Sequence, residues 1–188
     1  MRSTVGFVEN SVAPQRLAHD RGGVHVRRIT GEDAAVLRRV RLAALADAPS
    51  AFGSTYAAEA DRPDAEWAQR ASAGSAGSER ATFFAYLDDG VVGLVGGYRV
   101  EPSSATVELV SMWVAPHARS RGVGAALVDA VIQWALETRA TSIALWVTCG
   151  NAAAEALYGS KSFVGTGEVQ PLPSDASRDE ARMELAVG

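Results

Sequence analysis

VELVSMWVAPHARSRGVGAALVDAVIQWAL, residues 107–136, combines a strand, a turn and a helix in one continuous run. Residues 107–114 are rich in β-branched and aromatic side chains, which are typical of a strand. A polar turn holding Pro116 follows. Beyond Gly122, apolar side chains recur at helical spacing and predict one buried helix face, made of Val123, Leu127, Val131 and Trp134.

The junction between this strand and this helix carries an R-x-x-G-x-G element made by Arg119, Gly122 and Gly124. Glycine lets a ligand approach the backbone because it has no Cβ, and the first N–H groups of a helix are available to bind an anion. Arg119 and Arg121 add positive charge, so a pyrophosphate fits the turn. The same residues also fit a plain tight turn with solvated arginines. Neither the G-x-G-x-x-G dinucleotide pattern nor the phosphate loop of nucleotide hydrolases is present.

The segment SMWVAPHARSRGVGAALVDAVIQWA resembles the acyl-CoA-binding segment of the GNAT superfamily of N-acyltransferases: a strand, the pattern V-x-P-x-x-R-x-x-G-x-G, then a helix. A second block, IALWVTCGNAAAEALYGSKSFVGTGE, resembles the C-terminal part of the same superfamily. The resemblance runs over roughly residues 24–187 and is tightest over 107–163. It implies acetyl-CoA as co-substrate, bound by Met112, Trp113, Val114, Arg119, Arg121, Gly122, Val123, Gly124, Ala125 and Asn151.

Asn151 and Tyr158 lie two helical turns apart in the second block and therefore face the same side of a helix. The resemblance implies that Asn151 touches the pantetheine or diphosphate arm and that Tyr158 lies beside the thioester sulfur. Asn151 equally fits a helix N-cap, and the two roles are compatible. Tyr158 equally fits a half-buried core aromatic.

The sequence departs from the superfamily pattern at two positions. Ser162 stands where a glycine usually relieves a left-handed turn, which affects local strain and not the chemistry. Trp146 stands where the ribosomal-protein-alanine acetyltransferases carry a glutamate, so a base at that position is absent. The second departure weakens an assignment to that subgroup.

Transfer of an acetyl group to an amine requires a base for the amine and a proton for the leaving thiolate. Tyr158 is the expected proton donor, and Glu108, a carboxylate in the middle of the strand, is the candidate base. Glu108 also fits a solvent-facing strand position, in which case water takes the proton.

Backbone N–H groups of the strand near Met112 and Val114 would stabilise the oxyanion if the strand is irregular there. Strands that splay apart after Val114 and Val147 would admit the pantetheine arm. For Trp113 and Trp146 we favour a role in the core over one as walls of the acceptor pocket. We interpret Cys149 as a packing residue.

Composition sets wider bounds on the function. A chain of 188 residues is expected to form one domain over residues 23–188, preceded by a flexible arm over 1–22. The net charge of −4 argues against a nucleic-acid binder, and one cysteine with three scattered histidines argues against a metal site. No run of about 18 apolar residues predicts a membrane span. The opening MRSTVGFVENSVAPQRLAHD lacks the apolar segment of a secretory signal, so we expect a cytoplasmic protein.

The order of expected elements indicates an α/β fold. Strands are predicted over 24–29, 81–87, 91–100, 107–114, 142–148, 163–169 and 182–187; helices after Thr30, after Pro63 to about Ala71, after Gly122 and after Asn151. Residues 72–78, SAGSAGS, are expected to be a flexible connector, and Pro171 and Pro173 to bound a loop. The result is a mixed, mostly antiparallel central sheet of about seven strands flanked by about four helices.

The expected activity is acetyl transfer from acetyl-CoA to a primary amine by direct attack in a ternary complex. Residues 52–56 and 170–178 are expected to frame the acceptor, a small-molecule amine or a peptide N-terminus. A homodimer is compatible with the sequence. The alternatives are a non-catalytic acyl-CoA-binding sensor with the same turn and, more weakly, a nucleotide-binding module.

Overall fold

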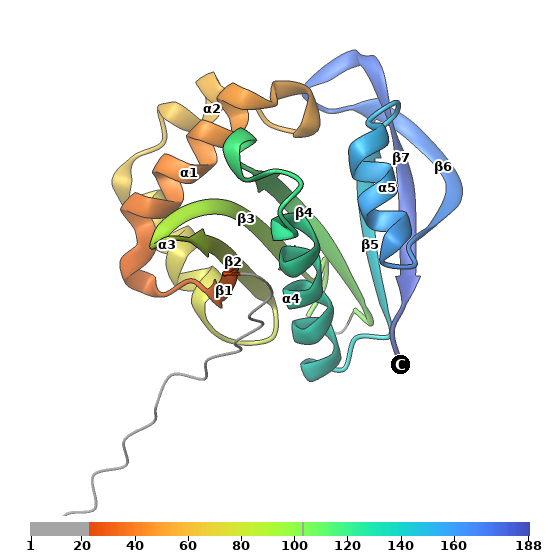
Figure 1. The fold of residues 1–188 in the computed structure, drawn as a ribbon, viewed down its shortest axis with the longest axis horizontal. Helices are drawn as coiled ribbons and strands as arrows, with labels where there is room; N and C mark the ends of the chain where they lie inside the picture. The colour runs from red at the N-terminus through yellow and green to blue at the C-terminus, as the bar shows by residue number, and fades with distance from the viewer. Residues whose placement is uncertain (1–22, 103) are drawn as a thin grey trace, which may run out of the picture.

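The computed structural model describes residues 23–102 and 104–188, which form one seven-stranded mixed sheet with helices on both faces (Figure 1). The strands are β1 (His25–Arg28), β2 (Arg80–Leu87), β3 (Gly90–Tyr98), β4 (Thr106–Val114), β5 (Ser142–Thr148), β6 (Val164–Leu172) and β7 (Asp175–Ala186). The helices are α1 (Ala34–Asp47), α2 (Tyr56–Ala60), α3 (Asp64–Ser75), α4 (Val123–Glu137) and α5 (Ala152–Ser160). Three short 3₁₀ turns lie at η1 (Gly31–Asp33), η2 (Pro49–Ala51) and η3 (Pro116–Ala118).

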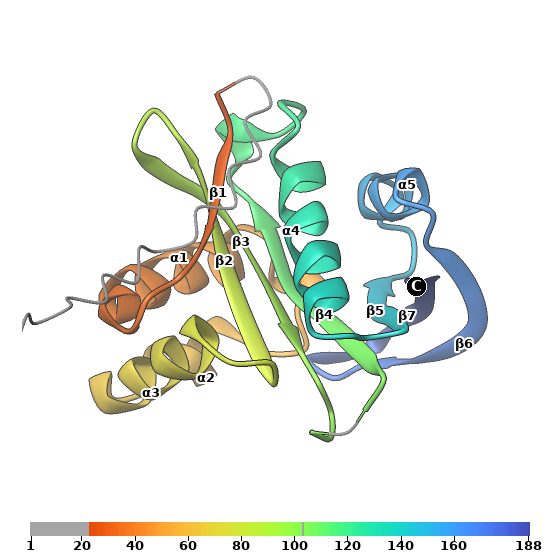
Figure 2. The same ribbon diagram turned by 90° about the horizontal axis from the view of Figure 1, so that it is seen from below.

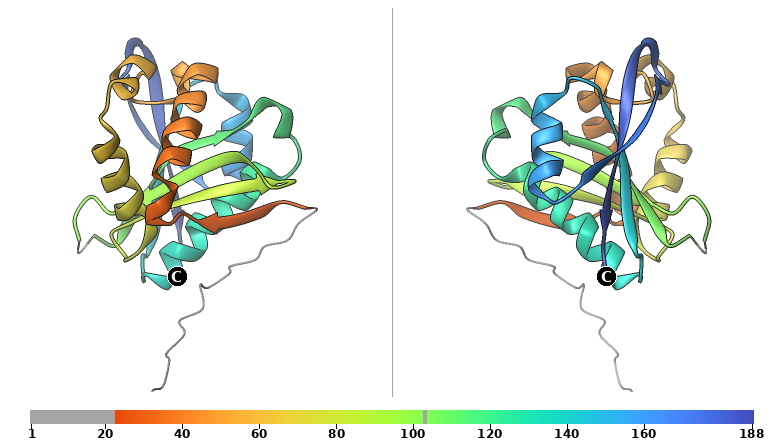
Figure 3. Two further views of the ribbon diagram at one scale, coloured as in Figure 1. Left: turned by 90° about the vertical axis from the view of Figure 1, so that its left-hand side faces the viewer. Right: turned by 90° about the vertical axis from the view of Figure 1, so that its right-hand side faces the viewer.

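The helices divide between the two faces of the sheet. Helices α4 and α5 stand on one face, and α1, α2 and α3 stand on the other (Figure 2). The left-hand view of Figure 3 shows α1 and α3 lying side by side across the sheet. The predicted apolar face of α4 is the centre of the core, since Val123, Leu127, Val131 and Trp134 are all at most 3% exposed. Burial of this face is the largest single reason for α4 to pack on β2, β3 and β4.

The sheet follows the order β1-β2-β3-β4-β5-β7-β6, and only the central pair, β4 and β5, is parallel. That pair is joined only over Thr106↔Ser142 to Glu108↔Ala144. Beyond Glu108 and Ala144 the two strands separate, and Figure 1 shows them diverging. The six remaining residues of β4 therefore have no partner strand on the β5 side.

Strand β4 is irregular where it leaves β5. Leu94 pairs with Trp113 and Gly96 pairs with Val110, so that two residues of β4, Ser111 and Met112, stand opposite one residue of β3. This is a β-bulge, and Ser111 adopts a left-handed conformation with φ of 58°. The irregularity on which the oxyanion role of the N–H groups near Met112 was conditional is present.

Most predicted elements are confirmed. The Asp88-Asp89 turn joins β2 to β3 with positive φ at both residues, as a tight hairpin requires. The helix expected after Thr30 is α1, and the carboxylate of Asp33 accepts a hydrogen bond of 2.6 Å from the N–H of Thr30 in a capping box before it. The short α2 was not predicted; it begins where the Thr55 hydroxyl accepts a hydrogen bond of 3.2 Å from the N–H of Ala58.

The predicted connector over residues 72–78 is wrong in its first half, because α3 continues to Ser75. Trp67, Ala71 and Gly74 form a buried stripe on this helix. A Cβ at Gly74 would lie 2.7 Å from Oγ1 of Thr82, so glycine allows the end of α3 to approach β2. This packing outweighs the low helix propensity of the Gly-Ser sequence.

The predicted loop at Pro171 and Pro173 is also wrong in part. Pro171 lies within β6 and pairs with Asp179 of β7. Strand β6 is at the edge of the sheet, where a proline without an N–H group is tolerated. Cys149 is exposed after β5 and does not pack in the core as expected. The arm expected over residues 1–22 lies outside the described residues. None of the described helices is both long and apolar enough to cross a bilayer.

Candidate active site

The turn into α4 has the backbone conformation that its glycines suggested. Gly122 is the N-cap of α4 in a left-handed conformation with φ of 81°, and a Cβ placed there would meet no atom within 4 Å. The N–H groups that follow, at Val123, Gly124 and Ala125, begin the helix and have no intrahelical acceptor. Ala126 is the first residue whose N–H bonds back to Gly122. The turn is open space in front of a positive helix end.

Gly124 has a different role from Gly122. A Cβ at Gly124 would lie 3.1 Å from Cδ2 of Leu157 on α5 and 3.4 Å from Cε of Met112 on β4. At Gly124, α4 therefore lies close to side chains of both α5 and β4. Its missing side chain serves helix packing, whereas that of Gly122 leaves the turn accessible.

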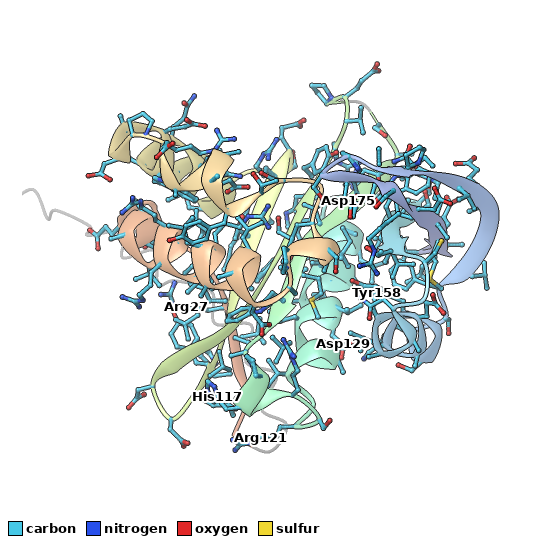
Figure 4. All side chains as sticks on the ribbon, turned by 90° about the horizontal axis from the view of Figure 1, so that it is seen from above. Arg27, His117, Arg121, Asp129, Tyr158 and Asp175 are labelled. Atoms are coloured by element: carbon cyan, nitrogen blue, oxygen red, sulfur yellow. The ribbon has the colours of Figure 1, made fainter. Side chains whose placement is uncertain are left out.

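The two arginines of the turn differ in their contacts. Arg119 donates a hydrogen bond of 3.0 Å from Nε to the carbonyl of Val114 and pairs with Asp47 at the end of α1. Asp47 also accepts a hydrogen bond of 2.9 Å from the indole of Trp113, which is a core residue as predicted. Arg121 is exposed and makes no ion pair within the described residues. In Figure 4, Arg121 and His117 lie close together at this turn.

The separation of β4 and β5 was predicted to begin after Val114 and Val147, but it begins earlier, after Glu108 and Ala144. The bulge at Ser111 lies within this separated part of β4, three residues beyond Glu108, and bends the strand there. The backbone of Met112, Trp113 and Val114 lines the second half of the separation, at the end of β4.

Helix α5 closes the opposite side of the separation. Asn151 caps it, with its side-chain oxygen accepting a hydrogen bond of 3.2 Å from the N–H of Ala154. Tyr158 is 5% exposed and packs edge-on against Phe163, with 5.7 Å between ring centroids. Burial raises the pKa of the Tyr158 phenol, so the group carries its proton throughout the physiological range. Lys161 pairs with Asp129 and so ties α5 to α4; Figure 4 shows Tyr158 and Asp129 near this junction. Ser162 is left-handed, with φ of 67°, as its place in the pattern indicated.

The other face of the sheet has a cavity of about 490 Å³ at the point where β4 and β5 separate, which we call the fissure cavity. It is lined by Gly53, Tyr98, Val100, Glu108, Leu109, Val110, Trp146, Gln170, Pro173, Glu180 and Arg182. Glu108 is 8% exposed, which rules out the solvent-facing position left open above. Trp146 is a wall of this cavity, not a core residue as expected.

Arg182 is the central charge of the fissure cavity. It donates a hydrogen bond of 2.8 Å to Glu108 and lies over the Trp146 ring, 5.4 Å from its centroid. Burial lowers the pKa of the Arg182 guanidinium, but the hydrogen bond to Glu108 and the nearby carboxylates outweigh it, and the net pKa is raised. Glu180, 8% exposed, accepts a hydrogen bond of 2.7 Å from Gln170.

Sequence reasoning missed Glu180 and Arg182 as site residues. Both could have been found, because residues two apart in a strand lie on the same face of the sheet. The predicted strand, however, began only at Arg182 and so left Glu180 out. Within residues 52–56, expected to frame the acceptor, Gly53 lines this cavity and Tyr56 is exposed on the outer side of α1. Phe52 is buried, and the centroid of its ring lies 4.6 Å from the Arg41 guanidinium. Asp175, at the β6–β7 turn, is exposed above this region (Figure 4).

A second cavity, of about 330 Å³, lies between α1, α3 and the sheet, and we call it the α1–α3 cavity. Arg41 enters it and donates a hydrogen bond of 3.3 Å to the hydroxyl of Ser111, the bulge residue. Arg41 and Arg70 each pair with Glu59 at 2.9 Å. Burial raises the pKa of Glu59, but its hydrogen bonds and charge interactions with the two arginines outweigh this and hold the pKa at about 2. None of these three residues had a sequence signal, because their contact joins three separate helices.

The family of the chain follows from comparison with known proteins. Residues 43–163 match the model of the acetyltransferase (GNAT) family, which is more than half of the chain. The chain belongs to the GNAT acetyltransferase family. A comparison with curated protein sequences gives no match.

Solved structures share the fold of this GNAT acetyltransferase. A GNAT-family acetyltransferase from Streptococcus pneumoniae is 20% identical with a TM-score of 0.73, covering 88% of this chain and 99% of that one. The yncA protein from Salmonella typhimurium, solved with acetyl-CoA, is 17% identical with a TM-score of 0.71, covering 88% and 94%. A GCN5-related N-acetyltransferase from Kribbella flavida is 24% identical with a TM-score of 0.70, covering 88% and 98%. These likenesses show that the chain shares the fold of these structures.

Proposed function

We propose that this acetyltransferase moves an acetyl group from acetyl-CoA to a primary amine by direct attack, with both molecules bound together. The observation that supports this most is the separation of β4 and β5. It has the glycine turn, the helix end and Tyr158 on one face, and the fissure cavity with Glu108 on the other. A thioester on the first side and an amine on the second would meet between the two strands.

The residues on the α4–α5 face fit acetyl-CoA. Gly122 leaves room for a diphosphate at the helix end, and Arg121 is an exposed cation beside it. The free edge of β4 at Met112, Trp113 and Val114 offers backbone groups to an extended arm. Val123, Gly124 and Ala125 would bind the diphosphate through their N–H groups, while Arg119 shapes the turn, and Asn151 would line the arm from α5. Acetyl-CoA supplies the activated acetyl group.

The chemical step needs three groups from the chain: a base, a hydrogen-bond donor to the carbonyl oxygen and a proton donor to the sulfur. The amine nitrogen forms a bond to the carbonyl carbon and the carbon–sulfur bond breaks. Glu108 accepts the proton that the amine loses, directly or through water. A backbone N–H at the Ser111 bulge stabilises the charge that grows on the carbonyl oxygen. Tyr158 hydrogen-bonds the departing sulfur and supplies its proton, and its raised pKa keeps that proton in place until the sulfur carries negative charge.

Release of free CoA thiol tests this function. The purified protein is mixed with acetyl-CoA and a panel of amines, and thiol release is followed together with the mass of the acetylated product. We expect release that depends on an amine. Binding of acetyl-CoA without release under any amine would identify a non-catalytic acyl-CoA sensor, and stabilisation by ATP or NAD but not by CoA would identify a nucleotide-binding module.

A further inference from the structure

The fissure cavity and the α1–α3 cavity adjoin each other and carry opposite charge. Both are lined by Tyr98 of β3 and Val110 of β4, so they meet at these two side chains. In the fissure cavity the carboxylates of Glu108 and Glu180 outnumber the guanidinium of Arg182. The α1–α3 cavity has no acidic lining residue and three basic ones: Arg41, Arg70 and Arg80. A ligand that spans both cavities therefore meets negative charge at one end and positive charge at the other.

The positive charge of the α1–α3 cavity is only partly neutralised by its surroundings. Arg41 and Arg70 share one carboxylate, that of Glu59. Arg80 makes no ion pair within the described residues, and its guanidinium lies over the Tyr98 ring, 5.2 Å from the centroid. An anion in this cavity would thus meet at least one guanidinium without a competing carboxylate.

The sheet register aligns the charges of the two cavities. Arg80 of β2 pairs with Tyr98 of β3, and Tyr98 pairs with Glu108 of β4. Residues in one register row lie on the same face of a sheet, and strands two apart are separated by about 10 Å. Arg80, Tyr98 and Glu108 therefore form a row of cation, aromatic ring and anion. The arginine side chain already leans toward the middle of that row.

We propose that the acceptor is a zwitterion, an amino acid or a short peptide with a free carboxylate, whose amine lies by Glu108 and whose carboxylate lies by Arg80. This assignment rests on the proposed function, because it names the acceptor class of the same site. Arg70 adds a second guanidinium to the carboxylate end, and Tyr98 lies beneath the atoms between the two charged groups. A polyamine would place a second cation among the arginines, which is unfavourable. An amine without a carboxylate would leave Arg80 without an anionic partner in the bound acceptor.

Matched acceptor pairs test the proposal. Lysine and lysinamide, β-alanine and β-alaninamide, and glycylglycine and glycylglycinamide differ in the carboxylate, and spermidine serves as a polyamine. We expect kcat/KM from thiol release to be at least 10-fold higher for the carboxylate member of a pair. Arg80→Gln should lower that value about 10- to 100-fold, as expected for loss of a charge-assisted hydrogen bond, and change the amide by less than twofold. Arg39→Gln, an exposed arginine on the outer side of α1, should change neither.

The outcomes separate this inference from the proposed function. Turnover of amides or spermidine as fast as that of the carboxylates, or an equal loss for both members in Arg80→Gln, overturns the zwitterion assignment and leaves acetyl transfer standing. A rate of thiol release that is the same with and without an amine overturns acetyl transfer. A thermal-shift comparison of N-acetyl-β-alanine with its amide reports on the anion site without turnover. Stabilisation by the acid alone, lost in Arg80→Gln, supports the site, and equal shifts contradict it.

Discussion

Arg182 of β7 reaches across β5 to donate a hydrogen bond of 2.8 Å to Glu108 of β4. The strand between them carries Ala144 in register with Glu108, and the small side chain of this buried alanine leaves room for the two longer ones to meet above it. The Trp146 ring supports the guanidinium from the same strand. The pair thus holds the Glu108 carboxylate at the place where β4 and β5 part.

Glu108→Gln should lower kcat/KM and remove the acidic limb of its pH profile, because glutamine cannot take the amine proton. Glutamine keeps the shape of the side chain and still accepts the hydrogen bond from Arg182, so the fold should be retained. Steady-state rates between pH 5 and 9 measure the effect. Glu168→Gln is the matched control, since Glu168 lies 3.7 Å from Arg182 but is exposed on β6. A Glu108→Gln profile identical to that of the wild type would exclude Glu108 as the base.

Tyr158→Phe should slow acetyl transfer by roughly 10²–10⁴-fold, the usual effect of removing a general acid, while acetyl-CoA still binds. The ring keeps its contact with Phe163, so the unfolding free energy should change little. Single-turnover rates are the proper measurement, because slow product release would hide part of the loss. A wild-type single-turnover rate would mean that Tyr158 is only a core aromatic and that water protonates the sulfur.

Gly122→Ala should raise the KM for acetyl-CoA far more than that for the amine, because the new methyl group lies in the turn that faces the diphosphate. Gly124→Val is a less clean test, since its side chain would also push Leu157 and α5 aside. Gly167→Ala is the control for backbone strain: Gly167 has φ of 88° and open space around it, but lies on β6. If Gly122→Ala and Gly167→Ala have equal kinetic constants, and calorimetry shows the same acetyl-CoA affinity in Gly122→Ala as in the wild type, the diphosphate does not bind at this turn.

Glu59→Gln should destabilise the fold by about 3 kcal/mol at pH 7, because two arginines, one of them buried, lose their shared carboxylate. The pKa of Glu59 falls from 4.5 to about 2 on folding, so its contribution is complete above pH 4.5 and is lost as the pH falls toward 2. Urea unfolding at several pH values should show the two proteins converging over that window. Glu66→Gln breaks the partly exposed pair with Arg62 and should cost under about 1 kcal/mol. A difference in unfolding free energy between wild type and Glu59→Gln that does not depend on pH would contradict a stabilising role for the ionised Glu59 carboxylate.

What the sequence could predict is what neighbouring residues determine. The buried face of α4, the cap at Asn151 and the left-handed Ser162 each depend on a few adjacent residues, and each is present in the structure. The chemistry of the residues indicated an anion site at the glycine turn. The family resemblance assigned that site to acetyl-CoA and added Tyr158 as a candidate, because both lie within two continuous motifs.

The rest depends on the order of the strands. Arg182 contacts Glu108 only because β7 lies next to β5 in the sheet. No local pattern in the sequence predicts this order of strands. The contact of Arg41 with Ser111 likewise joins residues 70 positions apart. The end of α3 was missed for a related reason: the fit of Gly74 against Thr82 is a tertiary contact, whereas the Gly-Ser composition describes only the isolated segment.

The three residue pairs that join β4 to β5 also bear on how the domain unfolds. They connect a four-stranded sheet, β1 to β4, with a three-stranded one made of β5, β7 and β6. So few backbone hydrogen bonds make this seam the place where sub-global opening costs least, and hydrogen exchange should proceed faster there than in β2 and β3. A molecule that bridges the two strands adds cross-links along the same seam. Binding of such a molecule is then expected to slow hydrogen exchange along the seam and to increase the cooperativity between the two halves of the sheet.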